Sequence, residues 1–149
     1  MNVAFIGLGI MGKPMVLNLR KAGYTLFVHG RRPESMAPLS EAGCTACQSP
    51  AEAASQADII IVMVSDTPDV EQVIFGDNGV IHGAKPGAVV VDMSTISPTA
   101  TRRFAADLRA RGIEMLDAPV SGGDVGAINA TLSIMVGGKP EVFARVKPV

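Results

Sequence analysis

The chain has 149 residues, 48% hydrophobic and 18% charged, a composition typical of one globular domain with a substantial core. A net charge of −1, no tryptophan and a single tyrosine exclude a basic surface or a stacking surface for nucleic acid. No apolar run approaches the roughly 20 residues of a transmembrane helix, and the N-terminus lacks the basic leader of a signal peptide. We therefore expect a cytoplasmic protein with no nucleic-acid or membrane partner.

Apolar strands and helices alternate through most of the chain. A buried strand over residues 2–7 precedes a helix over residues 11–22, whose apolar positions recur near every 3.6 residues. The later strands are expected at residues 25–29, 45–48, 58–64, 88–92 and 113–117, and the later helices at residues 33–42, 50–57, 68–75 and 95–111. This alternation predicts an α/β fold of the Rossmann type, a doubly wound, mostly parallel sheet with helices on both faces.

The pattern changes after residue 117. A glycine-rich loop, Ser121–Gly123, follows Pro119, and a seventh strand is expected at residues 131–136. A helix that begins at Pro140 is barely two turns long at Val149. We therefore expect residues 1–149 to be one dinucleotide-binding domain of a longer protein.

The first strand leads into Gly7-Leu8-Gly9-Ile10-Met11-Gly12, a G-x-G-x-x-G pattern at the start of a helix. In this context the first glycine permits a tight turn, the second lets a pyrophosphate approach the backbone, and the third allows close packing of helix and strand. The free amides at the start of the helix favour an anion. We predict that these six residues bind the diphosphate of a dinucleotide.

The end of the second strand indicates which nicotinamide cofactor is bound. Enzymes that use NAD usually place an acid there to accept hydrogen bonds from the adenosine ribose. Here Gly30 occupies that region, and Arg31 and Arg32 follow. Because a guanidinium can bind a 2′-phosphate through two parallel hydrogen bonds, we predict NADP(H), with NAD(H) as the alternative and Arg31 as the better candidate.

Cys44 and Cys47 form a C-x-x-C pattern. A redox pair should open a helix, and a zinc site needs further ligands that neither histidine is spaced to supply. We interpret the two cysteines as small core residues and expect no metal site.

Three blocks resemble the β-hydroxyacid dehydrogenase family, which includes 3-hydroxyisobutyrate dehydrogenase. They are the first glycine turn with its flanks (Phe5–Met15), Asp117-Ala118-Pro119-Val120-Ser121-Gly122-Gly123, and the segment 132–138; the run Val91-Asp92-Met93-Ser94-Thr95 also fits. The likeness spans the whole chain and is greatest to the tartronate semialdehyde (2-hydroxy-3-oxopropionate) reductase branch. The all-helical C-terminal domain of the family is absent from these residues.

The resemblance implies further site residues. Val64 and Ser65 would lie beside the cofactor and Thr95 near the nicotinamide, while Ser121, Gly122 and Gly123 would hold a substrate carboxylate. Without the resemblance, Ser94 and Thr95 would be interpreted as a helix cap, and Ser121 as a polar loop residue.

The chain also departs from the family pattern. Gly30 stands where relatives often have Asn or Asp, and Ala130 where many have Gly. The family's catalytic lysine lies in a glycine-rich motif expected beyond Val149, and Lys13, Lys139 and Lys147 do not match it. We therefore expect no catalytic residue in this chain, which alone should be inactive.

The resemblance implies an NADPH-dependent oxidoreductase that reduces a small aldehyde acid, such as tartronate semialdehyde, to a β-hydroxyacid, and that is a homo-oligomer at full length. Alternatives within the family are dehydrogenases of the 3-hydroxyisobutyrate or succinic semialdehyde and glyoxylate type. A dehydrogenase for a sugar acid phosphate should need a larger basic surface. A non-enzymatic dinucleotide-binding module would not need the carboxylate loop.

Overall fold

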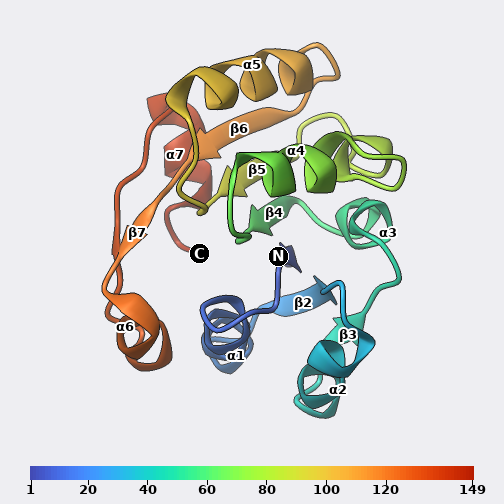
Figure 1. The fold of residues 1–149 in the computed structure, drawn as a ribbon, viewed down its shortest axis with the longest axis vertical. Helices are drawn as coiled ribbons and strands as arrows, with labels where there is room; N and C mark the ends of the chain where they lie inside the picture. Colours follow the sequence, from blue (N-terminus) through green and yellow to red (C-terminus); the bar gives the residue numbers. More distant parts are fainter.

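The computed structural model describes residues 1–149 and has a six-stranded sheet at its centre (Figure 1). The strands lie in the order β3-β2-β1-β4-β5-β6, and every neighbouring pair is parallel. Their bounds are β1 Asn2–Ile6, β2 Thr25–His29, β3 Thr45–Ala46, β4 Ile59–Val62, β5 Val89–Asp92 and β6 Glu114–Asp117. This order is the one typical of dinucleotide-binding folds, and it confirms the predicted Rossmann-type sheet.

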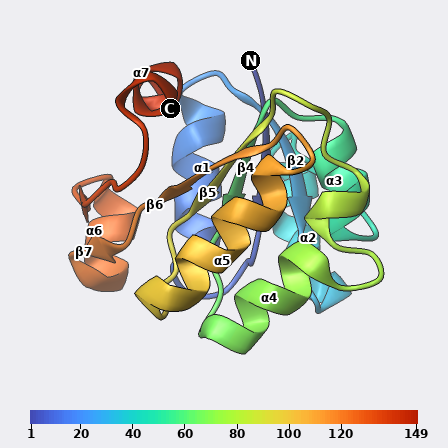
Figure 2. The ribbon, with the colours of Figure 1, turned by 90° about the horizontal axis from the view of Figure 1, so that it is seen from above.

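Helices cover both faces of the sheet (Figures 1 and 2). Buried side chains of α1, α2, α6 and α7 belong to one core cluster, and those of α3, α4 and α5 belong to the other. The bounds are α1 Gly12–Lys21, α2 Pro33–Glu41, α3 Pro50–Ser55, α4 Thr67–Phe75, α5 Pro98–Arg109, α6 Gly123–Asn129 and α7 Pro140–Val146, with a 3₁₀ turn η1 at Val80–His82.

Alternate residues of each central strand face opposite clusters. In β1, Val3 and Phe5 pack on the side of α1, whereas Ala4 and Ile6 pack on the side of α3 and α4. All four residues of β4 are buried, as the unbroken apolar run at this position predicted. The sheet is therefore a shared wall between two hydrophobic cores.

The segment after β6 differs from the sequence-based prediction. The expected seventh strand at 131–136 is only β8, Ser133–Ile134, and it pairs antiparallel with β7, Val120–Ser121, outside the main sheet. Gly123 opens α6, which was not predicted, so the segment Ser121–Gly123 is a strand end and a helix start. The Asn18 side-chain amide of α1 donates to the Ala127 carbonyl of α6 (2.7 Å), which holds α6 beside α1.

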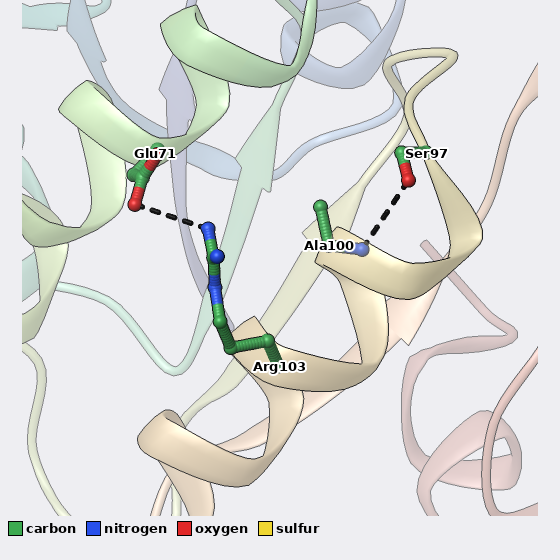
Figure 3. A network of polar contacts seen from close by, with 4 residues as sticks. All are labelled: Glu71, Ser97, Ala100 and Arg103. Atoms are coloured by element: carbon green, nitrogen blue, oxygen red, sulfur yellow. Dashed lines mark hydrogen bonds and ion pairs between the residues drawn. The ribbon is translucent and has the colours of Figure 1, made fainter.

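Contacts at the surface join α4 to α5 (Figure 3). Arg103 of α5 forms an ion pair with Glu71 of α4 at 3.1 Å, and Ser97 caps α5 by accepting the Ala100 amide hydrogen. Ser97, and not Ser94 or Thr95, is therefore the helix cap. Because both partners of the ion pair are exposed, it contributes little stability.

The residue before β2 contacts the end of the chain. The Tyr24 hydroxyl, just before β2, donates to the Pro148 carbonyl oxygen at 2.8 Å. Tyr24, Val146 and Val149 also pack against the cluster on the α1 side. No helix has both the length and the apolar character that crossing a lipid bilayer requires.

Candidate functional site: a cleft at the carboxyl ends of the strands

A cleft of about 1090 Å³ lies where the carboxyl ends of β1, β2 and β4 meet. The chain passes from β1 outward to β2 and β3, then returns to place β4 on the other side of β1. Open α/β sheets bind their ligands at this switch in direction. The cleft is lined by every predicted cofactor residue except Thr95, namely Gly7, Leu8, Gly9, Ile10, Met11, Gly12, Arg31, Arg32, Val64 and Ser65.

The three glycines of the turn differ in what surrounds them. Gly7 has φ +104°, and a Cβ there would collide with the Met63 carbonyl at the end of β4. At Gly12 a Cβ would collide with the Gly7 carbonyl and lie 3.2 Å from the Phe5 ring. At Gly9 it would meet nothing within 4 Å. Gly7 and Gly12 are therefore required by packing, whereas the protein leaves the space at Gly9 open on the cleft side.

The arginines lie between β2 and α2 and line the same cleft as the glycine turn. Arg31 and Arg32 are exposed, and the ion pairs of the chain involve neither of them. Gly30 is buried against Leu8 and Ser35, and a Cβ there would lie 2.5 Å from the Ser35 hydroxyl oxygen. This end of the cleft therefore presents two unpaired guanidinium groups and no side chain at position 30.

Sequence reasoning missed several residues that the fold brings to the cleft. Glu34, in the first turn of α2, lines the arginine end. Gln72 comes from α4, and Asp77 and Asn78 come from the loop after it. No sequence motif marks these residues as part of a site. Gln72, Asp77 and Asn78 reach the cleft only because α4, which follows β4, lies beside the glycine turn in the folded chain. Among the acids that line the cleft, Glu34 is the one that follows the arginines directly in the sequence, in the helix that begins after Arg32.

Hydrogen bonds with residues at the end of β5 hold the part of the cleft wall that follows β4. The Val64 N–H donates to the Ser94 hydroxyl oxygen at 2.9 Å, and the Ser94 N–H donates to Oδ1 of Asp92 at 3.0 Å. Asp92 is completely buried, and its Oδ2 has no hydrogen-bond partner. The pKa of Asp92 is raised from 3.8 to about 6. Burial raises this pKa most, hydrogen bonds from Ser94 lower it, and the negative charge of Asp117 on β6 raises it.

The remaining predicted residues do not line the cleft. Thr95 is exposed in the loop between β5 and α5, at the same edge of the sheet as the cleft. Ser121, Gly122 and Gly123 are exposed at the junction of β7 and α6, beyond the carboxyl end of β6. Gly122 and Gly123 have φ values of +133° and +64°, so the backbone turn here favours glycine.

The C-x-x-C pair lies in the core, as predicted. Both thiols are buried and free; Cys44 belongs to the cluster on the α1 side, and Cys47 belongs to the cluster on the other face. Burial raises the pKa of both thiols, that of Cys47 to about 11. Thiols on opposite faces of a sheet cannot share a metal ion or form a disulfide without rearrangement.

The chain is similar over its whole length to domains of known dehydrogenases and reductases. The sequence profile of the NAD-binding domain of 6-phosphogluconate dehydrogenase matches residues 2–149. The chain is 49% identical to a 2-hydroxy-3-oxopropionate reductase from Escherichia coli, covering 100% of this chain and 51% of that protein. It is 44% identical to an NAD-dependent L-serine dehydrogenase from Pseudomonas aeruginosa, covering 99% and 50%.

A solved structure of 3-hydroxyisobutyrate dehydrogenase from Mycobacterium tuberculosis, with L-serine, has a TM-score of 0.93 and 37% identity, covering 99% of this chain and 50% of that one. The chain thus spans about half the length of the relatives that it matches. With its glycine turn and strand order, the chain belongs to the family of NAD(P)-binding domains that 6-phosphogluconate dehydrogenase shares with the β-hydroxyacid dehydrogenases.

Proposed function

We propose that this chain is the NADPH-binding part of an oxidoreductase that reduces a small aldehyde acid to a β-hydroxyacid. The observation that carries the cofactor preference is the arginine end of the cleft, where Arg31 and Arg32 have no ion-pair partner and Gly30 has no side chain. A 2′-phosphate supplies the charge and the oxygen acceptors that these guanidinium groups lack. A carboxylate at position 30 would repel that phosphate.

The cleft also fits the rest of a dinucleotide. The open space at Gly9 and the amides at the start of α1 suit the diphosphate, with Ile10 and Met11 beside it. Val64 and Ser65 form the wall toward the nicotinamide end, with Thr95 beyond them. The nicotinamide, when bound, supplies the hydride that reduces a carbonyl carbon, while the residues of this chain hold and orient the cofactor.

Two observations support a small acid as substrate. Ser121 and the adjacent glycines are exposed beyond the carboxyl end of β6. Their backbone amides and the Ser121 hydroxyl can bind a carboxylate. The chain is also 49% identical to a reductase of 2-hydroxy-3-oxopropionate, which is itself a small aldehyde acid. We therefore propose tartronate semialdehyde or a close analogue.

The cofactor preference is tested by calorimetric titration of the protein with NADPH and with NADH. In Arg31→Ala, the Kd for NADPH should rise by about tenfold or more, because charge-assisted hydrogen bonds contribute about 1.5–3 kcal/mol. The Kd for NADH should change by less than about twofold, because NADH has no phosphate at that position. Arg111→Ala, which removes an exposed arginine outside the cleft, is the matched control.

Equal losses for the two cofactors in Arg31→Ala would remove Arg31 from the 2′-phosphate site. Tighter binding of NADH by the unaltered protein would overturn the NADP assignment and favour Glu34 as the group that binds the ribose.

The substrate is tested with the enzyme that contains this domain. Initial rates of NADPH oxidation with tartronate semialdehyde, succinic semialdehyde and glyoxylate should rank tartronate semialdehyde first in kcat/KM. A higher kcat/KM for the oxidation of 3-hydroxyisobutyrate or L-serine would reassign the substrate. Absence of turnover with all of them would favour the non-enzymatic binding module.

A further inference from the structure

Asp92 carries a fully buried carboxyl group at the end of a strand. It ends β5 after three buried valines, and its relative exposure is 0%. Oδ1 accepts the Ser94 amide hydrogen, but Oδ2 has no partner. Among the buried side-chain nitrogen and oxygen atoms, Oδ2 alone lacks a hydrogen bond. Because an unpartnered buried polar atom is costly, a carboxyl group at this position calls for a reason other than packing.

The hydrogen bonds of Asp92 lead to the cofactor cleft. Ser94 is buried, with 1% exposure, and its hydroxyl oxygen accepts the Val64 amide hydrogen at 2.9 Å. Val64 follows β4 and lines the cleft. Two successive hydrogen bonds thus connect a buried carboxyl group on β5 to the backbone of the cleft wall after β4.

The segment 63–64, which these hydrogen bonds hold, has little freedom to move. The Met63 N–H donates to the Ile6 carbonyl at 2.9 Å, and the Met63 carbonyl lies against Gly7. The position of residues 63 and 64 therefore sets the gap between the wall after β4 and the glycine turn. A shift of Val64 would change the width of the cleft at the turn.

We infer that Asp92 is a positioning residue for the cofactor, which acts by orienting Ser94 so that Ser94 fixes the Val64 backbone at the cleft wall. The inference rests on cofactor binding in the proposed function, but not on the choice between NADPH and NADH. Asp92 itself does not line the cleft.

Two measurements on single and double variants test this role. Ser94→Ala and Asp92→Ala should each raise the Kd for the cofactor that the protein binds by about threefold to tenfold, the range for one lost hydrogen bond. The double variant should lose little more than Ser94→Ala, because both substitutions break the same chain of contacts. Asp92→Asn keeps an oxygen acceptor for the Ser94 amide and should stay within about twofold of the original Kd.

Val90→Ala is the matched control. Val90 is buried on β5 and belongs to the core cluster beside α3, α4 and α5, so its truncation lowers stability but removes neither of the two hydrogen bonds of Ser94. Its Kd should be unchanged at a comparable loss of Tm. If Asp92→Ala and Val90→Ala weaken cofactor binding equally at equal loss of Tm, Asp92 is only a structural residue and the inference is overturned. A loss in Asp92→Asn as large as in Asp92→Ala would also overturn it.

Hydrogen exchange separates this inference from the proposed function. Without cofactor, the Val64 amide should exchange at least about threefold faster in Ser94→Ala and Asp92→Ala, whereas the Met63 amide, bonded to Ile6, should not. Unchanged exchange at Val64 would overturn the inference even where the NADPH preference holds. Faster exchange confined to Val64 would support it even where that preference fails. Should Asp92→Ala not fold, Ser94→Ala and Asp92→Asn carry both measurements.

Discussion

The buried carboxyl group of Asp92 makes the stability of the protein depend on pH. Burial raises its pKa from 3.8 to about 6, so the unfolded chain loses this proton at lower pH than the folded chain does. Between these two values the folded state binds more protons than the unfolded state. By linkage, the contribution of Asp92 to the free energy of unfolding falls as pH rises through this window and is constant above it.

We predict that Asp92→Asn becomes more stable relative to the unaltered protein as pH rises from about 4 to about 6. The gain should level off at up to about 3 kcal/mol, because each pKa unit corresponds to about 1.4 kcal/mol. Urea unfolding across this pH range measures the effect. Asp107→Asn, which replaces an exposed carboxyl group on α5, should show no comparable gain. A difference between Asp92→Asn and the unaltered protein that does not vary with pH would contradict the expectation.

At the scale of an element, the turn from β1 into α1 combines two separate requirements. Gly7 and Gly12 have no room for a side chain because backbone atoms of the protein occupy the space. Gly9 has room, and its open side belongs to the cleft. Substitutions can therefore separate folding of the turn from binding at the turn.

Gly12→Ala should lower the free energy of unfolding by about 1–3 kcal/mol, the usual cost of forcing extra volume into a packed site. Gly9→Ala should leave Tm nearly unchanged and weaken dinucleotide binding, since the added methyl group meets only the space that the ligand needs. Thermal unfolding and calorimetric titration of both variants give the two quantities. A Gly9→Ala variant that binds normally would show that the ligand does not approach Gly9.

The elements themselves were predictable where the sequence pattern is local. The buried strands of the central sheet, the glycine turn and the helices with proline near their starts follow from periodicity and end signals. The helix α6 was missed because Gly123 and Gly126 lower its intrinsic propensity. It is held by tertiary contacts, with Ala127 buried and bonded to Asn18, and no local pattern shows these.

At the scale of the whole molecule, one sheet joins two cores. Leu39 of α2 and Ile74 of α4 are fully buried on opposite faces. Because every central strand contributes residues to both clusters, neither face can lose its packing without disturbing the other. Unfolding should therefore be a single cooperative transition.

We predict that Leu39→Ala and Ile74→Ala each lower the free energy of unfolding by about 2–5 kcal/mol and leave one transition. Circular dichroism and amide exchange in increasing urea should give coincident curves for both variants. Leu17→Ala, at a position of α1 that is 42% exposed, should cost far less. Two separate transitions in either core variant would show that the faces unfold independently.

The whole molecule also explains how far the site could be predicted. The diphosphate turn and the arginines lie in single segments of sequence, so their roles could be predicted from the residues alone. Asn78 and Gln72 line the cleft only because α4 and the loop after it lie beside the turn. The contact of Ser94 with Val64 joins residues 30 positions apart, just after the ends of neighbouring strands, and no motif specifies it.

The bond between Tyr24 and Pro148 gives the protein an intrinsic optical reporter. With no tryptophan in the chain, Tyr24 is its only tyrosine, and its hydroxyl is tied to the segment after α7. Tyr24 does not line the cofactor cleft and lies before β2, whereas the cleft lies at the other end of that strand. Tyrosine emission therefore reports whether the segment after α7 is seated against the domain, and the fluorescence of a reduced nicotinamide reports the cleft. One sample can thus follow the two ends of the sheet at separate wavelengths without any label.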